Sequence, residues 1–322
     1  MKRNSMIAAA AGALSGILLV AAWQGSVFGV VLGLVFSPLP LAMTALGFGL
    51  SYLPVAVVSG AMAVAVLTGS VALAAIYLVF DGLPVAILAR AGLAAERVTR
   101  AVTPPEEAAP VSGQAIGIPI VCLTIAAVAL MATGLAMFPA GPDGLEAGLI
   151  ARLDRLVTES GMLHDLPDAA RATLVKTMVR VLPGAAAWNW SFRALMSVVV
   201  GQALLARDGF ARWPTPAYRS LAVPGWYVGS FWVATIAAMV ASGDTGFIIA
   251  NAAMVMSLPL VLQGLAVVHC AAARFGLSRM ALIAFYGVAL VAAGPALVLI
   301  VALGMMEHFS QMRRRMAAHN GG

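Results

Sequence analysis

The chain has 322 residues, of which 62% are hydrophobic and 10% are charged, and its formal net charge is +6. Since a soluble domain carries about 25% charged residues, a soluble protein of this composition could not cover its surface with polar groups. The basic residues lie in short loops and at the C-terminus, without a basic groove interleaved with aromatic residues, so nucleic acid is not an expected partner. We therefore expect an integral membrane protein whose first partner is the lipid bilayer.

Nine long apolar segments follow one another along the chain. Uncharged apolar stretches of about 18 residues or more are typical of membrane-spanning helices, whereas β-barrel strands are shorter and alternate polar with apolar residues. We therefore predict an all-α fold, a polytopic bundle of about eight to ten transmembrane helices. The segments are Met6–Ala22, Ser26–Gly49, Ser51–Thr68, Ser70–Ala89, Ala115–Met137, Leu182–Ala206, Val223–Ala241, Phe247–Ala273 and Met280–Met305.

The second of these segments is interrupted by Ser37-Pro38-Leu39-Pro40. Proline cannot donate a backbone hydrogen bond and breaks a helix. The segment is therefore predicted to form two half-helices, as either a re-entrant hairpin or two thin spans. Such backbone is tolerated in a membrane only where protein or a wet cavity covers it.

A polar stretch divides the apolar segments into two groups. Residues 91–114 include Pro104-Pro105-Glu106-Glu107 and are predicted to be a linker. They would separate N-terminal membrane helices in residues 1–90 from C-terminal membrane helices in residues 115–322.

The second group contains an insert, residues 139–181, that holds six of the 13 acidic residues. Within it, Leu145, Leu149, Leu153 and Leu156 recur at helical spacing, while Asp154 and Arg155 point away from that stripe. This pattern predicts an amphipathic helix outside the hydrocarbon region of the membrane.

The positions of the basic residues predict the orientation of the chain, because cytoplasmic loops carry the excess of lysine and arginine. Nine crossings from a cytoplasmic N-terminus place the arginines at 90–100, 207–219 and 274–279 in the cytoplasm, but place Arg313-Arg314-Arg315 outside. Counting the proline-broken segment as two crossings returns that run to the cytoplasm and moves the middle loops out. We expect both termini to be cytoplasmic, in the inner membrane of a bacterium.

The sequence lacks the motifs of conventional enzymes. It has no Gly-x-x-x-x-Gly-Lys-Ser/Thr loop and no Gly-x-Ser-x-Gly elbow, and its four histidines show no metal-ligand spacing. Two isolated cysteines predict neither a disulfide framework nor a metal cluster. We expect no enzymatic activity, no metal and no cofactor.

Asp81 is the single charged residue between Arg3 and Arg90. A carboxylate at the middle of a membrane span costs about 2.5–3.5 kcal/mol, so it requires a partner, a wet cavity or a proton. In a functional role Asp81 would bind a cationic group or relay a proton. In a structural role it would cap a broken helix or pair with Arg193.

Other polar residues in apolar surroundings are also candidates for ligand binding. Asn189 and Arg193 accompany two tryptophans at the start of the sixth segment, which is typical of either a ligand pocket or an interfacial aromatic belt. Asn251, Gln263 and His269 share the eighth segment, where they would line a groove or form interhelical hydrogen bonds. These five residues and Asp81 form the predicted set.

Several short motifs resemble the YybS-like family of uncharacterised bacterial membrane proteins. In the C-terminal half they are Val223-Pro224-Gly225-Trp226, Asn251, Leu258-Pro259, the run from Gln263 to His269, and Gly304-Met305-Met306-Glu307 followed by Arg313-Arg314-Arg315. In the N-terminal half Ser37-Pro38-Leu39-Pro40 fits the same pattern. The family favours aspartate where this chain has Glu307, which keeps the charge.

The N-terminal half of that family is similar to the substrate-binding S components of energy-coupling-factor transporters. The resemblance implies a small-molecule ligand and separate membrane and ATPase subunits as partners, which is compatible with the missing phosphate-binding loop. The extra C-terminal helices and the 139–181 insert depart from an S component.

We therefore expect a protein that binds or translocates a small molecule in the manner of a transporter substrate-binding subunit. One alternative is a non-catalytic membrane scaffold or regulator that docks a partner through the Leu145–Leu156 stretch. Another is a lipid-handling protein that uses Arg193 and the loop arginines near phosphate headgroups.

Overall fold

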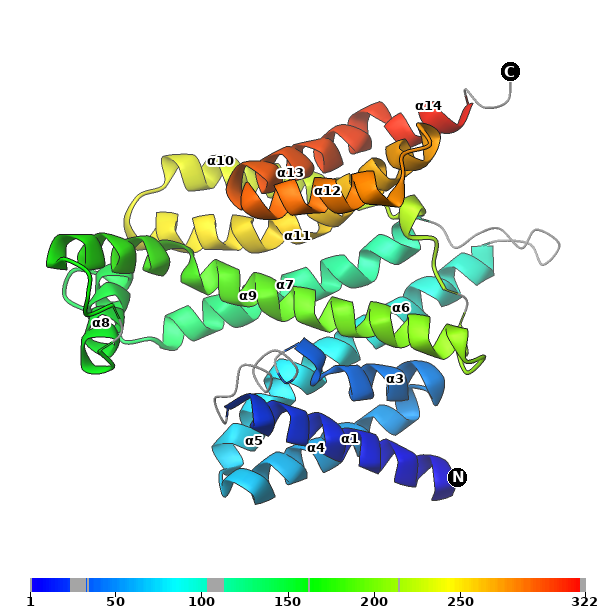
Figure 1. Ribbon diagram of the computed structural model, residues 1–322, viewed down its shortest axis with the longest axis horizontal. Coiled ribbons are helices and arrows are strands. Elements are labelled where there is room, and N and C mark those ends of the chain that lie inside the picture. Colours follow the sequence, from blue (N-terminus) through cyan, green and yellow to red (C-terminus); the bar gives the residue numbers. More distant parts are fainter. Residues whose placement is uncertain are drawn as a thin grey trace. The chain divides into compact units, whose positions relative to one another are not determined.

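The computed structural model describes residues 2–23, 33, 35–102, 113–161, 163–213 and 215–318. It confirms the predicted all-α fold, since every regular element in this part of the chain is a helix. Figure 1 shows these helices in chain order.

Within the described residues, six helical stretches are long and apolar enough to cross a membrane. Four of them are single helices: α1 (Lys2–Trp23), α7 (Gly113–Met137), α11 (Gly243–Arg274) and α13 (Ala293–Ser310). A fifth combines the 3-10 turn η1 (Leu50–Tyr52) with α4 (Leu53–Thr68). The sixth lies in the continuous run of α5 (Val71–Tyr77), the π turn η2 (Leu78–Gly82) and α6 (Leu83–Val102). Two shorter apolar helices are α10 (Gly225–Val240) and α12 (Arg279–Val291). The remaining helices are α3 (Leu39–Gly47), α8 (Leu145–Glu159), α9 (Asp168–Arg207), the 3-10 turn η3 (Tyr218–Ser220) and α14 (Met312–Ala318).

The chain packs into two compact units. Unit 1 comprises Met1–Leu123 and Trp190–Ala222, and unit 2 comprises Thr124–Asn189 and Val223–Gly322, so α7 and α9 contribute residues to both. Helix α6 covers the first part of the predicted 91–114 linker, and residues 103–112 of that linker lie outside the described residues. The predicted division of the chain at this linker stays a prediction.

The core of unit 1 is a close packing of α1 against α4. A Cβ atom at Gly12 would clash with the carbonyl of Ala56, and one at Gly16 would lie 2.5 Å from the carbonyl oxygen of Gly60. The two pairs keep the same register, so the helices run in the same direction with their backbones in contact. Small residues permit this approach, which membrane helices use in place of a hydrophobic driving force.

The described part of the proline-broken segment runs antiparallel to α1. The backbone of Gly33 lies next to Leu18 and Ala22, and the carbonyl of Ser37 accepts a hydrogen bond from Ser15. Helix α3 then continues in that direction from Leu39. The described part of the segment thus consists of two helical pieces that meet at Ser37-Pro38, as the two predicted half-helices do, and their arrangement as a hairpin or as two thin spans stays a prediction. The segment's first residues, 26–32, lie outside the described residues.

Unit 2 is organised around α11. Helices α10 and α11 form an antiparallel hairpin, and α13 crosses α11 where Gly264 and Gly304 bring the two backbones together. The apolar segment predicted as Met280–Met305 is two helices, α12 and α13, which meet at Ala292. The break follows from Pro295, which has no backbone N–H to donate to the carbonyl of Val291.

The 139–181 insert contains the predicted amphipathic helix, α8, and the first turns of α9. Asp244, at the start of α11, caps α8 by accepting hydrogen bonds from the backbone N–H groups of Leu145 and Glu146. Ion pairs of Arg180 with Glu146 and of Arg171 with Asp154 link the two helices. The sixth predicted segment, Leu182–Ala206, is the later part of the 40-residue α9.

Candidate functional site

A π-helical turn, η2, places Asp81 inside unit 1. The N–H of Leu83 bonds to the carbonyl of Leu78, five residues back instead of four, which leaves the carbonyl of Val79 without its usual helical donor. Pro84 has no N–H, so the carbonyl of Phe80 loses its donor as well. The sequence thus exposes two backbone acceptors on successive residues.

Helix α9 supplies donors to both acceptors from one face. The indole Nε1 of Trp190 donates to Val79 O at 3.2 Å, and the guanidinium of Arg193 donates to Phe80 O at 2.8 Å. Residues three apart share a helix face, so Trp190 and Arg193 reach the turn together. Trp190 and Arg193 can therefore reach the two exposed carbonyls from the same face of α9.

The same guanidinium pairs with the carboxylate of Asp81. Arg193 Nη2 lies 2.6 Å from Asp81 Oδ1, and the exposed fractions of the two residues are 7% and 0%. Ser37, at the break of the proline-interrupted segment, donates its hydroxyl to Asp81 Oδ2 at 3.0 Å. The charge pair thus joins three segments that are distant in sequence: the proline break, the π turn and α9.

A chain of hydroxyl groups extends the network to α1 and α5. Tyr77 donates to Ser15 Oγ at 2.9 Å, and Ser15 donates to the backbone carbonyl of Ser37 at 2.5 Å. All three residues are fully buried. The two charges therefore lie within a polar cluster whose members are hydrogen-bonded to one another.

Of the six predicted site residues, the structure brings Asp81 and Arg193 together. It adds Ser15, Ser37, Tyr77 and Trp190, which the sequence reasoning did not select. Pro84 was the available signal, because it frees the carbonyl of Phe80, which then needs another donor. Asn189 is exposed and belongs to unit 2, one residue before the boundary with unit 1.

Asn251 is a clamp between α11 and α9 in unit 2. Its side-chain oxygen accepts a hydrogen bond from the N–H of Gly184 at 2.7 Å, and its amide nitrogen donates to the carbonyls of Arg180 and Phe247. Gly184 permits this approach, since a Cβ atom there would lie 2.9 Å from the Asn251 oxygen. These contacts hold two helices together.

Gln263 bridges three parts of unit 2. Its oxygen accepts from the N–H of Val223 at 2.5 Å, and its nitrogen donates to the carbonyl of Gly304 at 2.6 Å. His269 Nε2 lies 2.7 Å from the hydroxyl of Tyr286 on α12. Asn251 and His269 are 18 residues apart on one helix, about 27 Å, so the polar residues of α11 occupy separate places.

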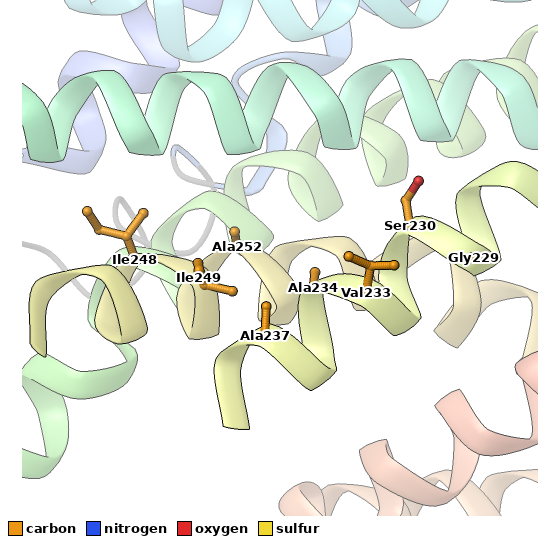
Figure 2. Close-up of a pocket in the computed structure, with 8 residues that line it drawn as sticks. All are labelled: Gly229, Ser230, Val233, Ala234, Ala237, Ile248, Ile249 and Ala252. Atoms are coloured by element: carbon orange, nitrogen blue, oxygen red, sulfur yellow. The ribbon is translucent and has the colours of Figure 1, made fainter. Parts of the chain in front are cut away.

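An open apolar groove runs between α10 and α11 (Figure 2). Small residues widen it, and branched side chains form its sides. It is lined by Gly229, Ser230, Val233, Ala234, Ala237, Ile248, Ile249 and Ala252.

These features define a class: a polytopic α-helical membrane protein with a charge pair buried among its helices. The family model described as Predicted membrane protein (DUF2232) matches residues 13–307, and the chain belongs to that family. No curated protein and no solved structure gives a significant match.

Proposed function

We propose that this protein binds or translocates a small molecule within the membrane, in the manner of a transporter substrate-binding subunit, and that the Asp81–Arg193 pair is its ionic switch. The observation that carries the proposal is the burial of this pair at a π turn beside the Ser37-Pro38 break. π turns occur frequently at functional sites. Ionisable residues within membrane segments commonly mark substrate or ion pathways.

Stability alone is a weak reason to keep such a pair. Replacing a buried ion pair with well-packed apolar residues is often neutral, or stabilising by about 1–4 kcal/mol. A ligand could replace either partner of the pair. A ligand cation can bind Asp81 in place of Arg193, and a ligand anion can bind Arg193 in place of Asp81. Either exchange would separate α9 from the π turn and the proline break, which gives ligand binding a route to helix movement.

The likeness of the N-terminal half to S components of energy-coupling-factor transporters, as in the YybS-like pattern, supports the same reading. Such a subunit would work with separate membrane and ATPase partners. In this proposal the protein has no enzymatic activity of its own and carries no cofactor.

Mass spectrometry of what co-purifies in mild detergent tests the proposal. We expect a single small molecule at near-equal stoichiometry with the protein, lost in Asp81→Asn and retained in the control Asp143→Asn, whose carboxylate is exposed. Bulk phospholipid alone, unchanged in all three proteins, would refute the proposal and favour a scaffold.

The α10–α11 groove supports a second candidate function, lipid handling. Its apolar lining and open side suit an acyl chain in a membrane (Figure 2). A liposome assay for lipid movement between leaflets tests it, with Ala234→Phe to fill the groove. Equal rates for the variant, the wild type and protein-free vesicles would exclude this function.

We also propose that the protein lies in the bacterial inner membrane with the arginine-bearing end of each unit in the cytoplasm. In unit 1 the start of α1, with Arg3, lies at the end where α3 finishes, and Arg212 there donates to the carbonyl of Phe48 at 2.6 Å. In unit 2 the turn after α11 carries Arg274 and Arg279, and α13 runs back to the same end (Figure 1).

The opposite end of unit 2 holds the 139–181 insert and Asp244, with seven acidic and five basic residues. The positive-inside rule then places the insert outside and both termini in the cytoplasm. The division of the ninth apolar segment into α12 and α13 adds the crossing that returns Arg313-Arg314-Arg315 to the cytoplasmic side.

A further inference from the structure

We infer that α8 is an interfacial helix that rests its leucine stripe in the headgroup layer of the membrane that the chain crosses. The occupant of this surface is phospholipid, and the contact uses Leu156 with Arg152 beside it.

The N-terminus of α8 is fixed at the membrane boundary of unit 2. Seven residues separate the end of the membrane helix α7 at Met137 from the first residue of α8. The carboxylate of Asp244, in the first turn of the membrane helix α11, accepts hydrogen bonds from Leu145 N at 2.8 Å and Glu146 N at 3.3 Å. Two crossing helices therefore hold α8 at the level where their apolar sequences end.

From that point α8 lies across the direction of α11 rather than continuing along it (Figure 1). A helix that lies across the membrane crossings at their ends runs along the membrane surface. Its 15 residues extend about 22 Å in that plane. An amphipathic helix in this position places its apolar face towards the acyl chains and its polar face towards water.

The exposure of the side chains follows this division. Leu145 and Val157 are buried against the rest of unit 2. Leu156, on the same stripe as Leu145, is 56% exposed. Thr158 is exposed on the opposite face, since two residues along a helix turn the side chain by about 200°. The stripe is thus used for packing at one end of α8 and left open at the other.

Arg152 lies one turn before Leu156, and its guanidinium lies 5.8 Å from the ring centroid of Phe138, the residue that follows α7. An arginine with an apolar stem beside an aromatic ring at a membrane boundary can extend its charged head to lipid phosphates. Lipid therefore matches both kinds of side chain on this face: acyl chain for Leu156 and phosphate for Arg152.

The test is the accessibility of nitroxide labels in vesicles of zwitterionic and anionic phospholipid. Labels are placed at Leu156→Cys and, as the matched control on the other face, at Thr158→Cys, with Cys122→Ser and Cys270→Ser in both proteins. We expect the label at 156 to collide more with lipid-soluble oxygen than with a water-soluble nickel complex, and the label at 158 to show the reverse.

Two results would overturn the inference. Equal and high nickel accessibility at both positions would mean that α8 stands clear of the bilayer. Protection of position 156 from both reagents would mean that another protein chain or a second copy covers it. If a labelled protein does not incorporate, Leu156→Trp in the native cysteine background gives the same answer through quenching by brominated acyl chains, with Thr158→Trp as its control.

Discussion

Removing one charge of the Asp81–Arg193 pair is expected to destabilise unit 1 more than removing both. Asp81→Asn leaves the Arg193 guanidinium, 7% exposed, without its counter-charge. Stranding a buried charge costs about 3–5 kcal/mol. In the double variant Asp81→Asn/Arg193→Met no charge remains, and the main residual cost is the carbonyl of Phe80 without its donor, about 1–3 kcal/mol.

The double variant should therefore be more stable than Asp81→Asn, although it carries one more substitution. Unfolding in detergent, followed by helical circular dichroism, gives the three free energies and the coupling between the two sites. If the losses of the two single variants simply add in the double variant, the charges do not interact and the pair is wrongly assigned.

Three further substitutions test other contacts, with the same unfolding measurement. Gly16→Val should separate α1 from α4 and destabilise the protein strongly, because a Cβ atom would lie 2.5 Å from the carbonyl oxygen of Gly60. The control Gly134→Ala, at a glycine with open space around it, should be neutral within about 1 kcal/mol. Equal effects of the two substitutions would refute the close packing of α1 and α4. Trp190→Phe should cost about 1–3 kcal/mol, since it leaves the partly buried carbonyl of Val79 in η2 without its donor. An unchanged stability would mean that this carbonyl finds another donor. Asn251→Ala should cost at least as much, because the N–H of Gly184 and the carbonyl of Arg180 lose their side-chain partner. A loss well under 1 kcal/mol would show that Asn251 does not hold α9 and α11 together.

The membrane helices could be predicted from sequence because their cause is local. A run of apolar residues must satisfy its backbone hydrogen bonds within itself once it is in lipid, and only a helix does so. The α8 stripe was equally visible, since Leu145 to Leu156 share one face at helical spacing. The break at Ala292 was missed because Pro295 lies within an otherwise continuous apolar run, and apolar composition alone does not mark where one helix stops.

The partners of the buried polar residues depend on distant segments and could not be predicted in the same way. The pairing of Asp81 with Arg193 was one of several alternatives, and 112 residues separate the two in sequence. Asn251 and Gln263 were expected to line a groove or to join helices, and their bonds to Gly184 and Gly304 join helices. The partners of those bonds are glycines on other helices, and the pattern within one segment does not indicate which distant glycine it contacts.

The prolines explain why the polar cluster of unit 1 lies where it does. Pro84 and the π turn before it free two carbonyls inside a membrane segment, where no water can satisfy them. Arginine on α9 can donate to the carbonyl of Phe80 and still have N–H groups left for a second acceptor. A buried guanidinium in turn needs a negative charge, which Asp81 supplies one residue after that carbonyl. The ion pair is therefore tied to the broken helices, and any ligand that displaces Asp81 from Arg193 acts directly on the part of unit 1 whose helical hydrogen bonding is already interrupted.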